Sequence, residues 1–175
     1  MSGSLFRKRY SCRRFLPDPI PRATVERLLD AARWAPTAGG LEPWRFVVVT
    51  DPGVRSALAR AAHGQRFLAQ APVVVCVVAV PAESAATYGR RGAELYCLQD
   101  TAAATQNLLL AAAAEGLGTC WVGAFDEAAV ARLLSLPAGW RPVALVPVGR
   151  PDEGPGPRRR RPLETIVTWI EGDAP

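Results

Sequence analysis

The chain of 175 residues has few of the side chains that usually carry acid–base or metal chemistry. It contains one histidine, His63, and no serine or cysteine nucleophile motif accompanies it, which argues against hydrolysis by an activated nucleophile. The cysteines at positions 12, 76, 97 and 120 form neither a C-x-x-C pair nor a zinc-type spacing. No cluster of His, Cys and carboxylates predicts a metal site. An enzyme with so few acid–base groups usually leaves the difficult chemistry to a cofactor.

Nucleotide-binding motifs of the common kinds are missing as well. There is no G-x-x-x-x-G-K-[ST] segment, so the sequence does not predict a phosphate-binding loop of the ATPase type. Gly116-Leu117-Gly118 begins like a dinucleotide-binding motif, but the next glycine, Gly123, has the wrong spacing. The segment also follows a predicted helix instead of a strand, which argues against a Rossmann fold.

Long hydrophobic runs are absent too. The basic N-terminus has no following apolar segment of the kind that signal peptides contain. The most apolar helical stretch, Leu108 to Ala114, is too short to span a membrane. Isolated thiols without disulfide spacing fit a reducing compartment, so we expect a cytoplasmic protein without membrane attachment.

Positive charge is abundant, but it is concentrated in two arginine-rich clusters. Apolar residues make up 49% and charged residues 21%, as in a globular protein, and the length fits one domain over residues 1–175. The net charge is +5: residues 7–14 carry five positive charges, residues 158–161 carry four, and the rest of the chain sums to −4. Guanidinium groups suit bidentate contacts with phosphate. No aromatic residue interrupts residues 158–161, so nucleic-acid binding is not predicted.

Hydrophobic periodicity and turn residues predict alternating helices and strands. Four strands are predicted, over residues 44–50, 73–80, 119–124 and 142–148. The second of these is apolar enough to be buried on both faces of a sheet. Helices are predicted after Pro21, and over residues 54–62, 65–70, 91–115 and 127–134. The pattern indicates an α/β or α+β layered fold.

Two segments suggest packing against further surfaces. The predicted helix over residues 91–115 is rich in alanine, either because small side chains allow another helix or subunit to approach, or because alanine is the best helix former. The C-terminal segment has an apolar face with Ile166, Trp169 and Ile170. Such a tail needs a surface to cover, and a partner subunit would provide one.

Six segments occur in an order that is typical of one family. They are R-Y-S-C-R-R-F (9–15), A-R-W-A-P-T-A-G-G-L-E-P-W (32–44), G-Q followed by A-P-V-V-V (64–75), G-L-G-T-C-W-V-G (116–123), V-G-R-P (148–151) and R-R-P-L-E (160–164). Together they resemble the nitroreductase family of FMN-dependent NAD(P)H oxidoreductases over about residues 7–168. The resemblance implies an α+β, three-layer fold with a central, mainly antiparallel sheet flanked by helices. It also implies a homodimer with exchanged C-terminal tails and two FMN molecules at the interface.

The resemblance further implies which residues hold FMN. Arg9 and Ser11 would bind on the phosphate and ribityl side, and Arg158 and Arg160 would complete the phosphate site. Arg13 would lie near the flavin N1–C2=O edge. The remaining implied contacts are Tyr10, Glu42 and Trp121, the segment of Pro36, Thr37, Ala38, Gly39 and Gly40 from the other subunit, Gln65 at the ring edge, and the backbone around Val122 and Gly123, which would face flavin N5.

The implied reaction moves a hydride from NADH or NADPH to flavin N5, after which a nitroaromatic, quinone or similar planar acceptor takes the electrons in a ping-pong mechanism. Arg13 would act electrostatically on the charge of the reduced flavin, and no acid or base residue is assigned. The sequence departs from the family pattern at Gly40, where Asn is common, and at Glu42, where Gln is common. It also lacks a long insertion between Val80 and Arg91, which predicts an open pocket.

Two alternatives remain open at this point. A flavin enzyme for reductive dehalogenation or oxygen-dependent flavin breakdown would share the same fold. A protein that holds FMN without turnover would also share the binding residues.

Overall fold

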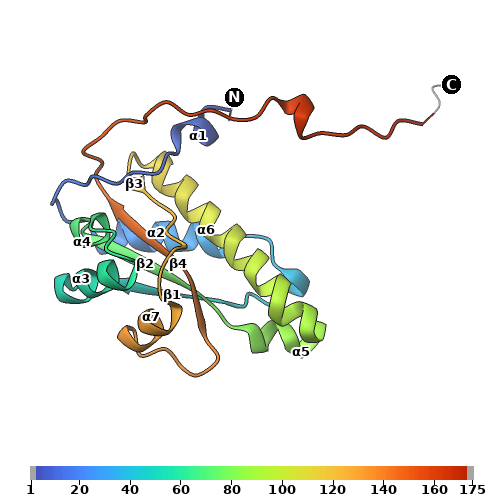
Figure 1. Ribbon diagram of the computed structural model, residues 1–175, viewed down its shortest axis with the longest axis horizontal. Helices are drawn as coiled ribbons and strands as arrows, with labels where there is room; N and C mark the ends of the chain where they lie inside the picture. The colour runs from blue at the N-terminus through green and yellow to red at the C-terminus, as the bar shows by residue number, and fades with distance from the viewer. Residues whose placement is uncertain (1–2, 173–175) are drawn as a thin grey trace.

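A four-stranded antiparallel sheet lies between two layers of helices in the computed structural model, which describes residues 3–172 (Figure 1). The strands are β1 (Trp44–Val49), β2 (Val73–Ala79), β3 (Gly118–Thr119) and β4 (Arg141–Gly149), in the order β1-β2-β4-β3. The helices are α1 (Gly3–Lys8), α2 (Arg22–Arg33), α3 (Pro52–Ala61), α4 (Phe67–Gln70), α5 (Pro81–Arg91), α6 (Cys97–Ala114) and α7 (Glu127–Leu133). Short turns of other helix types are η1 (Ala38–Gly40), η2 (Gly92–Tyr96) and η3 (Leu163–Thr165). This arrangement confirms the predicted three-layer α+β fold.

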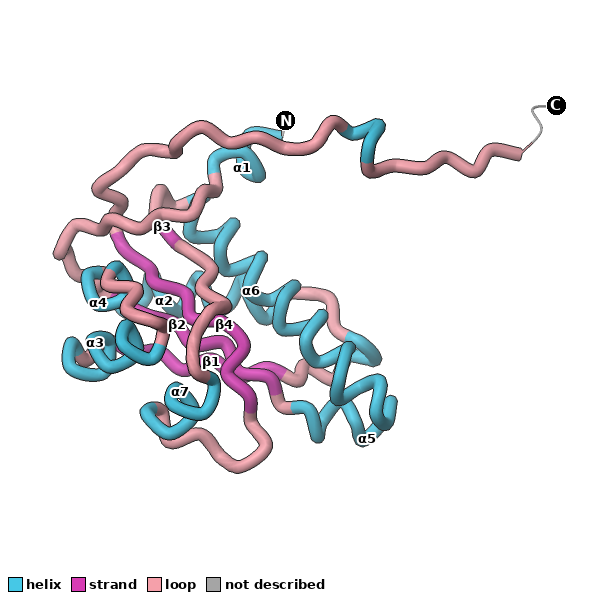
Figure 2. Tube along the Cα trace, viewed as in Figure 1, coloured by secondary structure: helices cyan, strands magenta, loops and turns pink. Residues whose placement is uncertain are grey.

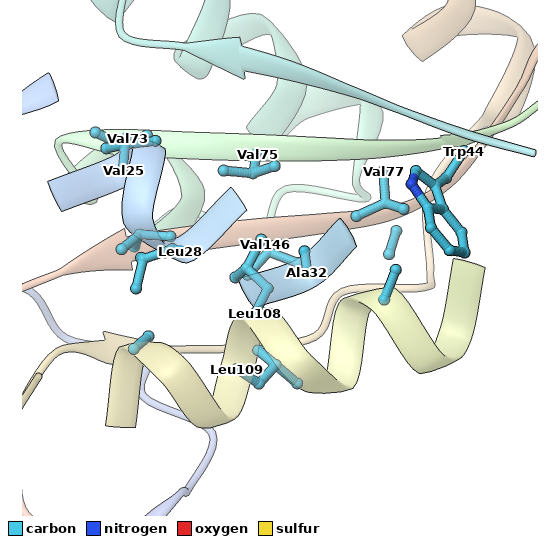
Figure 3. Close-up of a cluster of buried hydrophobic side chains, with 14 of the residues drawn as sticks. Val25, Leu28, Ala32, Trp44, Val73, Val75, Val77, Leu108, Leu109 and Val146 are labelled. Atoms are coloured by element: carbon cyan, nitrogen blue, oxygen red, sulfur yellow. The ribbon is translucent and has the colours of Figure 1, made fainter. Parts of the chain in front are cut away.

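Strand β2 forms the centre of the molecule, and all seven of its residues are buried. Because side chains alternate along a strand, Val73, Val75 and Val77 face α2 and α6 (Figure 3). The residues between them, including Cys76, face α3, α4 and α7. Burial raises the pKa of the Cys76 thiol to about 12, as expected of a core residue. The prediction of a strand buried on both faces is therefore confirmed.

Helices α2 and α6 pack tightly on one face of the sheet. Val25, Leu28 and Ala32 of α2 lie in the same core cluster as Leu108 and Leu109 of α6 (Figure 3). The Asn107 side chain of α6 donates a hydrogen bond to the Ala31 carbonyl at 3.2 Å. Two alanines of α6, at positions 104 and 112, are fully buried in this cluster, so the small side chains face a neighbouring helix of the same chain.

The predicted strand over residues 119–124 is shorter in the structure. Regular pairing ends at Thr119, and a single isolated bridge then joins Val122 to Leu145. The register that pairs Thr119 with Val148 and Val122 with Leu145 places Pro147 opposite Cys120. Proline has no N–H to donate, so the ladder is interrupted there.

The long helical region begins earlier than predicted. Pro81 occupies the first turn of α5, a position that suits its fixed φ and missing N–H. Gly89, with φ 53° and ψ −140°, then bends the chain, and a π-helical turn over Gly92–Tyr96 leads into α6. Helix α1 was not predicted from the sequence. Within residues 3–172, no helix combines the length and apolarity that a membrane crossing requires.

The C-terminal tail extends away from the rest of the molecule (Figure 1, Figure 2). Residues 154–172 are all exposed, and η3 is their only helical turn. Trp169 is 78% exposed and Ile170 is 97% exposed. Large apolar side chains at such exposure indicate a segment without its packing surface.

Candidate functional site

The N-terminal segment over residues 9–16 crosses the ends of β3 and β4. Its backbone pairs with them through hydrogen bonds from Cys12 N to Thr119 O and from Leu16 N to Arg150 O, both at 2.9 Å. Cys12 and Phe15 are buried beneath the segment. A Cβ atom at Gly118 would meet the Cys12 sulfur at 2.7 Å, so this close approach requires glycine.

Burial of Cys12 leaves its neighbours Ser11 and Arg13 exposed on the outer side. There they line a groove of about 480 Å³, together with Arg9 and with Arg158 and Arg160 of the tail. The two arginine clusters, far apart in the sequence, therefore meet at one surface. We call this surface the arginine groove; its lining residues are Arg9, Tyr10, Ser11, Arg13, Glu153, Gly154, Gly156, Pro157, Arg158 and Arg160.

Side-chain hydrogen bonds of Arg158 and Tyr10 join the tail to the N-terminal segment. The Arg158 guanidinium donates to the backbone carbonyls of Arg7 and Arg9. The Tyr10 hydroxyl donates to the backbone carbonyl of Glu153. Both side chains thus shape the groove through protein contacts, and fewer Arg158 donors remain for a ligand than the sequence implied.

Glu153 is the acidic residue among those that line the groove. Its Oε1 accepts the backbone N–H of Arg13 at 2.5 Å. The Arg13 guanidinium carbon lies 6.0 Å from the centre of the Phe67 ring, within the range of a cation–π contact. Arg13 is therefore anchored at its backbone by Glu153, and its guanidinium is placed over Phe67.

Gln65 and the segment over residues 121–124 are joined to each other by a hydrogen bond, and neither is among the residues that line the arginine groove. The Gln65 Nε2 donates to the carbonyls of Ala62 and Ala124, both at 3.0 Å. Its two N–H groups are thereby used within the protein, and only its carbonyl oxygen is available for the predicted contact with a ring edge. Val122 is fixed by backbone hydrogen bonds with Leu145, while Trp121 and Gly123 are exposed.

The loop over residues 36–42 lies at the other end of α6, beside its junction with α5 (Figure 1). Asp100, near the start of α6, accepts hydrogen bonds from the Thr37 hydroxyl and the Ala38 N–H. The arginine groove lies near the end of the helix, since Ala113 shares a pocket with Arg9. Along α6 this separation corresponds to about 20 Å. One chain therefore does not bring the predicted contacts of this loop (Pro36, Thr37, Ala38, Gly39, Gly40 and Glu42) to the groove.

Two buried thiols lie beneath the arginine groove. Burial raises the pKa of Cys12, and it also raises the pKa of Cys120, although the Arg13 charge and a hydrogen bond with Ser11 act in the opposite direction. Both are therefore poor thiolate nucleophiles. In the part of the chain that the structure describes, no group of three or more His, Cys, Asp or Glu side chains could hold a metal ion.

Asp100 and Glu153 were missed by the sequence reading. Asp100 lies in an apolar, alanine-rich helix. An acidic residue on the buried side of such a helix indicates that its carboxylate has a polar partner, so the sequence could have predicted it. Glu153 gives no comparable signal, because its role depends on the pairing of residues 150–153 with the N-terminal segment.

The chemistry of the donor set suits a phosphate monoester. Guanidinium groups from two segments, the Ser11 hydroxyl and a bordering aromatic ring are the kinds of groups that bind phosphate and an attached planar ring. The groove has no paired general acid and base. Its residues are thus suited to hold and polarise a ligand.

Comparisons with known proteins agree with this chemistry. A model of the nitroreductase family matches residues 6–65 and 60–150. The "NADH dehydrogenase" of Thermus thermophilus is 35% identical over 93% of this chain and 92% of its own length. The 5,6-dimethylbenzimidazole synthase of Rhodobacter capsulatus is 34% identical over 85% of this chain and 82% of its own length. The structure of the NADPH:FMN oxidoreductase from Vibrio harveyi in complex with NAD⁺ superposes with a TM-score of 0.87 at 25% identity, covering 98% of this chain and 77% of that chain.

The raised thiol pKa values lead to a prediction about reactivity. A raised pKa lowers the thiolate fraction at any pH below it, so at about pH 8 none of the four cysteines should react rapidly with Ellman's reagent in the native protein. All four should react after denaturation in guanidinium, which serves as the control. A rapid phase in the native protein that disappears in a Cys120→Ser variant would contradict the structural role given to Cys120.

Proposed function

The chain belongs to the nitroreductase family, and on this premise we propose that it is an FMN-dependent NAD(P)H oxidoreductase. NADH or NADPH would be the electron donor, and nitroaromatic, quinone or similar planar compounds the acceptors, in a ping-pong mechanism. The observation that carries the proposal is the arginine groove, where two distant basic clusters meet.

The residues of the groove fit the cofactor at its phosphate end. Arg9 and Arg160 carry exposed or half-exposed guanidinium groups at the groove, and the exposed Ser11 hydroxyl lies between the Arg9 and Arg13 positions. We assign the FMN phosphate to Arg9, Ser11 and Arg160. Arg158 contributes by fixing the tail against the carbonyls of Arg7 and Arg9, which sets the width of the groove.

Arg13 has a different role from the phosphate-binding residues in this proposal. When bound, FMN supplies a hydride acceptor at N5 and the electrons for the second substrate. Arg13, whose backbone N–H binds Glu153 and whose guanidinium lies over the Phe67 ring, places a positive charge where negative charge develops. Such a cation stabilises the charge without moving a proton, which agrees with the lack of an acid–base pair in the groove.

A homodimer completes the site in this proposal. The loop over residues 36–42 lies about 20 Å along α6 from the groove of its own chain. In a symmetric pair, the loop of one subunit reaches the groove of the other, so each of two sites contains both parts.

The exposed tail provides the second link between subunits. Strand β1 pairs on one side only, with β2, and is therefore an edge strand. Beside it lies an apolar hollow of about 490 Å³ lined by residues that include Ile20, Val25 and Val48. An extended chain adds readily to such an edge, so we place the partner's tail there, with its exposed apolar side chains covering the hollow.

The first test is reduction of the purified protein. We expect a yellow preparation that contains FMN and is bleached by NADH or NADPH without oxygen, with colour returning when a quinone or nitroaromatic is added. A protein that neither binds added FMN nor bleaches would refute the proposal. One relative is a synthase and not a reductase, and oxygen-dependent flavin breakdown is one of the alternatives that the sequence left open. The flavin should therefore also be quantified after aerobic turnover. Intact FMN supports the reductase, and its consumption would instead support flavin breakdown.

The second prediction concerns the phosphate contacts. Replacing both Arg9 and Arg160 by Ala should weaken FMN binding about a hundredfold or more, because each charge-assisted hydrogen bond contributes about 1.5–3 kcal/mol. Flavin fluorescence titration of the apoprotein measures this change. The matched control is Arg60→Ala with Arg132→Ala, which removes two exposed arginines from α3 and α7, outside the groove. Equal affinity in both double variants would show that the phosphate binds elsewhere.

The third prediction concerns which subunit supplies the loop over residues 36–42 to each FMN site. Gly39→Val should damage the loop, since Gly39 has φ 62° and an added Cβ would meet the Tyr88 hydroxyl at 2.6 Å. Mixing this variant with the Arg9→Ala, Arg160→Ala variant should restore about a quarter of the wild-type FMN sites after subunit exchange, because half of the dimers are mixed and each mixed dimer has one intact site. If the loop served its own chain's groove, mixing would restore nothing.

A further inference from the structure

Asp100 connects helix α6 to the loop over residues 36–42. It is 6% exposed, and its Oδ2 accepts the Thr37 hydroxyl at 2.8 Å. Both carboxylate oxygens lie 3.2 Å from the Ala38 nitrogen, which donates to them. The Thr37 hydroxyl oxygen in turn accepts the Glu42 N–H at 3.0 Å. A continuous set of hydrogen bonds thus runs from α6 to both ends of the loop.

The loop needs such an anchor because one of its residues, Glu42, is strained. Gly39, Gly40 and Glu42 all have positive φ values, of 62°, 69° and 50°. The left-handed region is unfavourable for a residue with a side chain such as Glu42, and it persists only where the surroundings enforce it. Tyr88 supports the loop from the other side, close to Gly39, and its ring packs edge-on against Tyr96 with centroids 5.1 Å apart.

The position of Asp100 on its helix is otherwise apolar. One and two turns further along the same face, Ala104 and Leu108 are fully buried in the core. An apolar residue at position 100 would avoid the solvation cost of a buried carboxylate. The carboxylate is therefore explained by the two donors that it binds, and those donors belong to the loop.

We propose that Asp100 is a positioning residue that holds the loop over residues 36–42 in the shape in which it closes over the FMN bound by the partner subunit. This inference rests on the proposed function. An aspartate suits the position better than an asparagine, because both loop groups donate and an amide would direct its own N–H toward one of them. Asp100 is buried, and both of its carboxylate oxygens accept hydrogen bonds from Thr37 and Ala38 of the loop, so its effect on flavin binding is exerted through the loop.

The test begins with the flavin-free protein. In Asp100→Asn, we expect backbone hydrogen exchange to accelerate about tenfold or more within residues 37–42, while exchange in β2 and β4 stays as in the wild type. Thr37→Val removes the hydroxyl that links Asp100 to Glu42 and should have the same effect. Thr37→Ser keeps that hydroxyl, so hydrogen exchange within residues 37–42 should be as slow as in the wild type. The control is Asp51→Asn, which alters a carboxylate that caps α3 and accepts the Val54 N–H at 2.8 Å.

The second measurement is FMN affinity of the same variants by fluorescence titration. We expect Asp100→Asn and Thr37→Val to bind FMN about tenfold more weakly, since a hydrogen bond to a charged group is weakened or lost in each. The circular dichroism of the bound flavin should also change, because the loop no longer holds a fixed position. Asp51→Asn, which lies outside both the loop and the arginine groove, should retain wild-type affinity and spectrum.

The outcomes separate this inference from the proposed function. If the wild type binds FMN, and Asp100→Asn and Thr37→Val exchange and bind as the wild type does, Asp100 is not a positioning residue. If neither the wild type nor any variant binds FMN, the proposed function is refuted, and hydrogen exchange alone still decides whether Asp100 anchors the loop. Thr37→Val keeps the test decisive should Asp100→Asn fail to fold, because Thr37 is only partly buried.

Discussion

The pairing of the N-terminal segment with the ends of β3 and β4 determines where the chemistry of this protein lies. Cys12, Leu16 and Asp152 donate backbone hydrogen bonds across this junction at 2.9 Å. These bonds bring a basic cluster near residue 9 beside another near residue 158. Arginines held close together repel one another, so backbone pairing must supply the free energy that keeps them in place. The result is a groove in which positive charges from two distant segments are brought together before any anion binds.

Helix α6 imposes the second constraint. It buries one face against α2 and the sheet, which makes it a rigid spacer between two functional parts of the chain. One part is the arginine groove near its end, and the other is the loop that Asp100 holds near its start. A rigid helix of this length cannot bring the two parts together within one chain. This geometry supports the proposed dimer, and the exposed tail is a second observation in its favour.

Local patterns in the sequence predicted the core of the fold well. The apolar run at residues 73–80 forms the buried central strand, and the helix predicted over residues 127–134 is α7, which Asp126 caps by accepting the Ala129 N–H at 2.9 Å. The errors arose where the outcome depends on a distant partner. The strand after Thr119 is interrupted by Pro147 of a neighbouring strand, and Glu153 reaches Arg13 only through tertiary pairing. Periodicity within one segment carries no information about either contact.

The two departures from the family pattern acquire a structural meaning in the loop that Asp100 holds. Gly40 has φ 69°, and asparagine is among the residues that adopt this region most readily, so glycine and asparagine both suit the backbone there. Glu42 and glutamine have equally long, unbranched side chains, so φ 50° is equally demanding for either. The exchanges therefore preserve the shape of the loop and change only the groups it presents. An amide is lost at position 40, and a carboxylate is gained at position 42. Because Thr37 and Asp100 fix the backbone independently of these side chains, the loop can vary its chemistry toward the ligand while its position stays the same.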